Sequence, residues 1–378
     1  MKREVNALFA ALSFAVCGED RLDDYAALFS DEEFLQRTAK LAAYHDLAHL
    51  LYYSLKEKKI IDKKSGDIYK RAENYIMSAA VRYERLSETT NKVCALFEKN
   101  EIPYIPLKGA VLRSLYPEPF MRTSCDTDIM VTPGDVDKAA SLIKSELGGK
   151  AEWSGDHDIP IYFENGTHIE LHFSFSGLPF GGEEIMKDVF SKSTLKPGTA
   201  FCYEMPDNLF YYYHIAHMAK HIKNGGCGIK PFIDLYLLDK QKGDGRAETL
   251  KRGGLYEFSQ NASKLSNIWM SGKMPSGELL DLAKYILRGG SYGNQKTKAR
   301  QASSEFQNAA GRVFLPYSKL KFHYKELENH KWLYPYCAVK RLLRLAFKTL
   351  PGIISSSRKK ADTEKAAKTA EMMKQIGL

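Results

Sequence analysis

The residues best suited to chemistry in this 378-residue chain are acidic and lie in two short stretches. Asp126 and Asp128 are separated by one residue in an alternating segment rich in Ile, Met and Val, which predicts a strand. Residues i and i+2 of a strand point to the same side, so the two carboxylates project together. In a later predicted strand, Glu170 shares a face with His168 and His172. If the two strands are neighbours, three carboxylates converge.

Three converging carboxylates need a cation. Two like charges about 4 Å apart repel by about 4 kcal/mol at an effective dielectric constant of about 20, so a bare cluster would protonate or splay. Hard oxygen ligands without thiolates favour Mg²⁺, or Mn²⁺, over zinc. Such ions can activate an attacking hydroxyl and hold the phosphates of a nucleotide in line. The competing interpretation is that Asp-x-Asp only caps the following helix and that Glu170 is a surface residue.

Other common catalytic signatures do not occur in the sequence. It has no Gly-x-x-x-x-Gly-Lys-Ser/Thr, His-Glu-x-x-His or Gly-x-Ser-x-Gly motif, which argues against P-loop enzymes, zincins and α/β-hydrolases. The glycine-rich run 225–228 follows a predicted helix, so we interpret it as a helix C-terminus and linker. The six cysteines are scattered without a Cys-x-x-Cys pair, which favours a reducing, cytoplasmic location. No apolar run is long enough to predict a membrane-spanning helix.

Periodic patterns place the acidic stretches in a small α/β unit that follows a helical region. Residues 1–99 keep helical spacing, most clearly over 67–98. The N-terminal stretch resembles a signal peptide, but its apolar residues follow helical spacing and no small-x-small cleavage site follows, so we expect the first helix of a soluble protein. The predicted pieces of the unit are a strand over 102–107, helical turns over 110–116, a strand over 126–131, a helix over 136–147, and strands over 159–163 and 167–173 joined by an Asn-Gly turn.

Helices return after Gly177, and the chain divides into four predicted parts. The clearest later helices are expected over 206–223 and 231–238. The predicted parts are an N-terminal helical region over 1–99, the α/β core over 100–178, a C-terminal helical domain over 179–354 and a charged tail over 355–378. The tail has few large apolar residues, which predicts a loose chain or a solvated helix. The predicted fold class is α+β, with a small mixed-sheet core flanked by helical regions.

The order of these pieces resembles the DNA polymerase beta-like nucleotidyltransferase superfamily. In that order, a glycine-bearing turn opens a short helix, a strand with Asp-x-Asp follows, and a later strand adds a third acid. The chain is more closely similar to the bacterial family of uncharacterised nucleotidyltransferases. The residues that resemble this family are Leu107-Lys108-Gly109, Tyr116-Pro117, Arg122, Asp126 to Ile129 and Ile169 to His172, with more diffuse similarity at His214 to His217, Phe232 to Leu235 and Leu333 to Tyr336.

The resemblance implies transfer of a nucleoside monophosphate from an NTP, with ATP the expected donor and Mg²⁺ or Mn²⁺ the cofactor. It implies that Asp126, Asp128 and Glu170 are the metal ligands and catalytic residues, with Glu170 also the base for the acceptor hydroxyl. Lys108 and Gly109 would hold the triphosphate. It also implies a small mixed nucleotidyltransferase sheet backed by helices.

Arg122 and His172 complete the predicted nucleotide-binding residues. Arg122 is expected to pair with the acids or with phosphate. His172 shares a face with Glu170, which suits positioning of phosphate or acceptor, or a packed hydrogen bond. His157 precedes the hairpin in a loop that would cover the cleft. A face of His214, His217 and His221 at i, i+3 and i+7 suits packing and hydrogen bonding, or lining of the nucleotide cleft.

The sequence departs from the superfamily pattern at the phosphate-binding turn. The superfamily usually has Gly-Ser before the short helix, whereas this chain has Lys108-Gly109, and Ser114 is too far along to substitute. The alternative function is therefore a non-catalytic nucleotide-binding or regulatory module on the same fold. The sequence does not identify the acceptor of an active enzyme.

The net charge of +9 is concentrated near the C-terminus. Residues 313–360 contain eleven Lys and Arg but two acidic residues, and the remainder of the chain is balanced. Within them, Lys340, Arg341, Arg344 and Lys348 recur at helical spacing, which predicts a basic amphipathic helix. One interpretation is binding to an acidic macromolecule, such as RNA, an acidic protein or an anionic membrane surface. The other is a terminal helix packed on the core with its charges in water.

Overall fold

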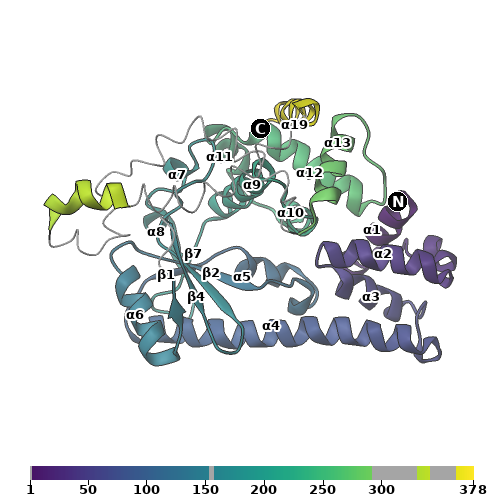
Figure 1. The fold of residues 1–378 in the computed structure, drawn as a ribbon, viewed down its shortest axis with the longest axis horizontal. Helices are drawn as coiled ribbons and strands as arrows, with labels where there is room; N and C mark the ends of the chain where they lie inside the picture. Colours follow the sequence, from purple (N-terminus) through teal and green to yellow (C-terminus); the bar gives the residue numbers. More distant parts are fainter. Residues whose placement is uncertain (1, 153–156, 292–329, 341–362) are drawn as a thin grey trace.

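The computed structural model describes residues 2–152, 157–291, 330–340 and 363–378, and Figure 1 shows how their helices and strands are arranged. The first hundred residues are helical, and the first helix and the long helix are confirmed. These elements are α1 (Lys2–Cys17), η1 (Asp23–Ser30), α2 (Glu32–Tyr44), α3 (Ala48–Glu57), η2 (Lys63–Ser65) and α4 (Asp67–Lys99).

A mixed five-stranded sheet follows, in the order β1-β2-β5-β4-β3. Its strands are β1 (Tyr104–Pro106), β2 (Asp126–Val131), β3 (Lys150–Ala151), β4 (Asp158–Tyr162) and β5 (His168–His172). Among them, β2 and β5 pair in parallel, and the other neighbours pair antiparallel. The predicted hairpin and the predicted α+β class are confirmed. The connecting elements are α5 (Gly109–Leu112), η3 (Arg113–Leu115), η4 (Pro119–Met121) and α6 (Val136–Leu147).

The chain after the sheet is mainly helical. It starts with α7 (Gly182–Ile185), α8 (Val189–Lys192) and a two-stranded sheet of β6 (Thr194–Leu195) and β7 (Tyr203–Glu204). The helices that follow are α9 (Asp207–Lys223), α10 (Lys230–Lys240), α11 (Arg246–Arg252), α12 (Tyr256–Met270) and α13 (Glu278–Gly289). The glycine-rich run 225–228 lies between α9 and α10, as predicted for a helix C-terminus and linker. After α13, the described residues form two further elements, η6 (Lys331–Leu333) and α19 (Thr363–Gln375).

Helix α4 belongs to two hydrophobic cores. Near its start, Ala72 lies in a core that joins α1–α3 to α9, α10 and α12. Near its end, Val93 and Phe97 lie in a second core with the strand residues Ile129 and Leu171. Figure 1 shows α4 running along the base of the molecule, from the N-terminal helices to the sheet. This helix therefore fixes the position of the sheet relative to the N-terminal helices. The division of the chain into four parts stays a prediction.

The described end of the chain is a helix, one of the two expected alternatives, but one face of it is buried instead of solvated. Residues 363–375 form α19, and Met372, Met373 and Ile376 are buried in the first core. The helix contacts α13. Three apolar residues within two turns are enough to pack one face of a helix, although the surrounding sequence is rich in Lys and Ala.

Most of the basic stretch 313–360 lies outside the described residues. Of the four cations proposed for its amphipathic helix, Lys340 alone is described, and the predicted helix stays untested. In the described ranges, no helix combines the length and apolar character needed to cross a membrane. The cytoplasmic location stays a prediction.

Candidate active site

The register of β2 and β5 brings the predicted acidic residues together. Asp128 lies opposite Glu170, and Asp126 lies opposite His168. On the other face of β2, the hydroxyl of Thr127 is hydrogen-bonded to that of Thr90 on α4 at 2.9 Å. Because side chains alternate along a strand, this contact with α4 leaves both aspartates on the opposite face.

The polar atoms on this face form two overlapping groups that share Glu170. In the first, carboxylate oxygens of Asp126 and Glu170 and a ring nitrogen of His168 lie within 4.8 Å of one another. In the second, atoms of Asp128, Glu170 and His172 are equally close. The three carboxylates that the sequence predicts to converge therefore do so. Their roles as metal ligands and catalytic residues remain predictions.

Asp128 is compensated from two sides. Its Oδ1 lies 2.6 Å from Nζ of Lys108 and 2.8 Å from Nε2 of His172. Burial would raise the pKa of this carboxyl, but Lys108 and His172 hold it well below its ordinary value. Burial also disfavours charge on Lys108 and His172, whereas Asp128 and Glu170 raise the pKa of both. The Asp128 carboxylate and the Lys108 ammonium are therefore both charged at neutral pH.

Asp126 is less fully compensated, because Lys108 acts on its carboxyl from a greater distance and lowers its pKa less than burial and the neighbouring acids raise it. Over the described ranges, ion pairs reach Asp128 and Asp234, but none reaches the Asp126 carboxylate. Burial, together with the charges of Asp128 and Glu170, raises the pKa of Asp126. A divalent cation would offset that repulsion, and carboxylate oxygens are the donors that Mg²⁺ and Mn²⁺ prefer. The residues present therefore fit the predicted cation.

The turn between β1 and α5 brings Lys108 to the carboxylates. Lys108 has a φ of 38°, in the left-handed region that is costly for a residue with a side chain. The backbone N–H of Leu107 donates to the carbonyl of Asp128 at 3.0 Å, which ties the turn to β2. A Cβ on Gly109 would lie 2.7 Å from Nη1 of Arg122, so the close approach of that guanidinium requires glycine.

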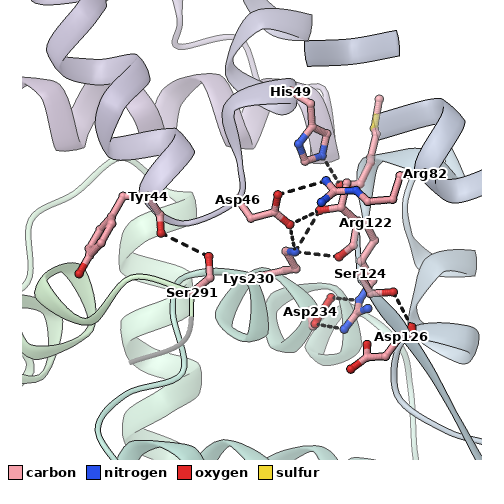
Figure 2. Close-up of polar contacts among 12 residues, drawn as sticks. Tyr44, Asp46, His49, Arg82, Arg122, Ser124, Asp126, Lys230, Asp234 and Ser291 are labelled. Atoms are coloured by element: carbon pink, nitrogen blue, oxygen red, sulfur yellow. Dashed lines mark hydrogen bonds and ion pairs between the residues drawn. The ribbon is translucent and has the colours of Figure 1, made fainter. Parts of the chain in front are cut away.

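Arg122 pairs with an acid other than the predicted carboxylates. Its Nε and Nη2 donate to Oδ1 and Oδ2 of Asp234 on α10, both at 2.8 Å (Figure 2). The hydroxyl of Tyr116 also donates to Oδ1. Asp234 is 1% exposed. The third nitrogen, Nη1, is the one that approaches Gly109. The bidentate pair therefore fixes the guanidinium beside the turn.

The segment between Arg122 and Asp126 is held by a second ionic contact. Nζ of Lys230, one helical turn before Asp234 on α10, donates to the carbonyl and hydroxyl of Thr123 and to Oδ2 of Asp46 at 2.7–3.0 Å. Figure 2 shows Asp46 reaching this point from the connection between α2 and α3. Ser124 completes the segment, because its hydroxyl donates to the carbonyl of Asp126 at 2.8 Å. Two successive turns of α10 thus hold the residues that lead into β2.

A cleft of about 470 Å³ opens above the sheet. Its lining includes all seven predicted site residues: Lys108, Gly109, Arg122, Asp126, Asp128, Glu170 and His172. His157 also lines it, with Nε2 3.1 Å from a carboxylate oxygen of Asp158, and the covering of the cleft by its loop stays a prediction.

Helix α9 forms another wall of this cleft. His217, Lys220 and His221 line the cleft, and the Nε2 atoms of the two histidines lie 3.0 Å apart. His214 instead forms a hydrogen bond to the carbonyl of Pro231 at 3.0 Å. Of the two interpretations of this histidine face, packing therefore applies to His214 and lining of the cleft to His217 and His221.

Four residues of this site have no role assigned from the sequence. Asp46 and Lys230 hold Thr123, Asp234 holds Arg122, and His168 joins the first polar group. Asp234 lies in a segment that resembles the family, but no local pattern pairs it with Arg122. A signal does exist for His168, because its position in β5 places it on the face of Glu170.

Comparisons with known proteins identify the family of this chain. A family model described as Uncharacterised nucleotidyltransferase matches residues 31–270, and the chain belongs to this family. The solution structure of antibiotic-resistance factor ANT(2'')-Ia is similar at 7% identity, over 50% of this chain and 91% of that chain, with a TM-score of 0.29. No curated protein matches the sequence.

Proposed function

We propose that this protein is a divalent-cation-dependent nucleotidyltransferase that moves a nucleoside monophosphate from an NTP, with ATP the expected donor, to a hydroxyl acceptor. The observation that supports this most strongly is the convergence of Asp126, Asp128 and Glu170 in one cleft with Lys108. Membership of the nucleotidyltransferase family supports the same reaction class.

In this proposal, Asp126, Asp128 and Glu170 hold Mg²⁺ or Mn²⁺, which supplies positive charge at the phosphates and orients the reacting groups. Lys108 has three N–H donors, of which one bonds to Asp128 and another lies beside the Tyr213 hydroxyl, so the third is available to the β- and γ-phosphates. Gly109 leaves room for the donor at the turn. Arg122 and His172 line the same cleft, where they contact phosphate or acceptor.

Glu170 is the proposed base. Its side chain is 26% exposed, more than the buried Asp128, so it faces the open part of the cleft. The acceptor oxygen forms a bond to the α-phosphorus while the bond from that phosphorus to the oxygen bridging to the β-phosphorus breaks. The hydroxyl proton passes to Glu170, and pyrophosphate leaves.

Calorimetric titration with ATP and Mg²⁺, together with an assay of pyrophosphate release, tests this function. The variant Asp126→Ala/Asp128→Ala should lose both ATP binding and pyrophosphate release. Asp137→Ala removes an exposed acid from α6 and should keep both. Equal ATP binding and equal pyrophosphate release by the wild type and the double variant would refute the proposal.

The second candidate is a nucleotide-binding or regulatory module without turnover. The feature that favours it is the turn, where Lys108-Gly109 replaces the Gly-Ser pair usual in the superfamily and Lys108 already pairs with Asp128. This candidate predicts stabilisation by nucleotide, about 2.7 kcal/mol at a hundredfold excess over Kd, without pyrophosphate release for any acceptor. Turnover with any physiological acceptor would exclude it.

A further inference from the structure

We propose that His168 is a nitrogen ligand of the divalent cation and that it makes the site prefer Mn²⁺ to Mg²⁺. The inference rests on the cation dependence of the proposed function, but not on the identity of the donor or acceptor. It adds a residue that neither the motifs nor the family assigns to the site.

His168 is held beside Asp126 by its neighbours in the sheet. It lies between Asp126 on β2 and Tyr162 on β4 in the register of the sheet. Its ring stacks on that of Tyr162, with centroids 4.6 Å apart and planes at 13°. This stacking restricts rotation of the imidazole, so its nitrogens keep a fixed direction relative to the carboxylates of Asp126 and Glu170.

One nitrogen of His168 lacks a partner. Its Nε2 is buried and forms no hydrogen bond in the described structure. Buried polar atoms are normally paired, and such an exception calls for an explanation, for which a bound ion is one of the usual causes. A ring nitrogen of the same residue lies within 4.8 Å of carboxylate oxygens of Asp126 and Glu170, so the imidazole belongs to the candidate cation group.

The other candidate nitrogen is already engaged. Nε2 of His172 lies 2.8 Å from Oδ1 of Asp128 and 3.5 Å from Oε2 of Glu170, and Lys108 bonds to the same oxygen of Asp128. The Asp126 carboxylate, by contrast, forms no ion pair with a described side chain, and the longer contact of 3.5 Å from His172 is the ion pair that reaches Glu170. A cation is therefore expected to bind first on the Asp126 side of Glu170.

The donor set determines which cation binds best. Two carboxylates alone suit Mg²⁺ and Mn²⁺ alike, whereas an imidazole nitrogen favours the more readily polarised transition ion. Mg²⁺ keeps oxygen ligands and water and gains little from nitrogen. An Asp126, His168 and Glu170 group should therefore bind Mn²⁺ at least about tenfold more tightly than Mg²⁺.

The test uses the full-length protein with Mn²⁺ or Mg²⁺ alone. Calorimetry gives the two affinities, and electron spin echo envelope modulation of bound Mn²⁺ detects ¹⁴N within its coordination shell. We expect ¹⁴N coupling in the wild type. In His168→Gln, whose amide oxygen is a hard donor, the coupling should weaken and the Mn²⁺ preference should fall about tenfold, with Mg²⁺ affinity little changed. His157→Gln is the matched control, since His157 lines the same cleft outside both polar groups.

The outcomes separate this inference from the proposed function. Mn²⁺ bound to the wild type without ¹⁴N coupling would overturn the role of His168 and leave the cation dependence intact, and this result needs no variant to fold. The role of His168 would also be overturned if the ¹⁴N coupling and the preference for Mn²⁺ over Mg²⁺ were the same in His168→Gln as in His157→Gln. If the wild type binds neither ion, both the inference and the cation dependence fail.

Discussion

Arg122 and Asp234 lie 112 residues apart in the chain and form two parallel hydrogen bonds of 2.8 Å in the interior. The arginine precedes the strand of Asp126 and Asp128, and the aspartate belongs to α10. The pair therefore joins the helical part of the chain directly to the segment that leads into the acidic strand. Nη1 of the same arginine limits the space beside Gly109.

Removal of Asp234 should destabilise the protein strongly. Asp234→Asn leaves the buried Arg122 guanidinium without its counter-charge, which costs about 3–5 kcal/mol of unfolding free energy. Urea unfolding measures the change. The control is Asp207→Asn, because Asp207 forms a similar pair with Arg246 at 2.5–2.6 Å but is 40% exposed. Its loss should stay below about 1 kcal/mol. Equal losses in the two variants would contradict the structural role of the buried pair.

Stability should fall as the pH drops below 6.5. Burial lowers the pKa of His45 and of His49 to about 4 in the folded protein. Between pH 6.5 and 4 the unfolded chain therefore binds more protons than the folded protein, and the stabilisation present above pH 6.5 is lost. Each histidine should contribute about 1.4 kcal/mol per pH unit in this window. Unfolding curves at several pH values for wild type and His49→Gln should show a shallower slope in the variant, and equal slopes would argue against a buried neutral His49.

A side chain at residue 109 should disturb the site. The Cβ of Gly109→Ala would lie 2.7 Å from Nη1 of Arg122, which Asp234 prevents from moving freely. We expect a loss of about 1–3 kcal/mol in unfolding free energy and weaker ATP binding. Gly134→Ala is the control, because its Cβ would meet the Thr132 hydroxyl at a comfortable 3.8 Å. If both variants bind ATP as the wild type does, close approach at Gly109 is not required.

The basic stretch 313–360 predicts binding to polyanions. If it contacts an acidic macromolecule, affinity for RNA or anionic vesicles should fall steeply with salt, because each neutralised phosphate releases counterions. Substitution of Lys340, Arg341, Arg344 and Lys348 together by Gln should weaken this binding and leave ATP affinity unchanged. If the quadruple variant binds RNA and anionic vesicles as the wild type does, or if the wild type binds neither at low salt, these charges belong to a solvated face.

Local patterns predicted the strands and the face of the acidic residues well. The alternation around Asp126 and the Asn-Gly turn before β5 depend on residues close in sequence, and both are confirmed. Contacts between distant residues have no such signal. The sequence separation is 184 residues for Asp46 and Lys230, and their pairing depends on how α10 packs against the N-terminal helices. The burial of α19 was missed for the same reason, because its partner α13 is distant in the chain.

The most direct test of the proposed transfer measures which phosphate of ATP is transferred to the acceptor. Wild-type protein and Asp126→Ala/Asp128→Ala would be incubated with cell extract, Mg²⁺ or Mn²⁺, and ATP labelled at either the α- or the γ-phosphate. Nucleotidyl transfer predicts that the wild type moves label from the α-phosphate, and not from the γ-phosphate, to an acceptor fraction, whereas the variant moves neither. Transfer of γ-label, or equal transfer of α-label by wild type and variant, would contradict a nucleotidyltransferase centred on these carboxylates.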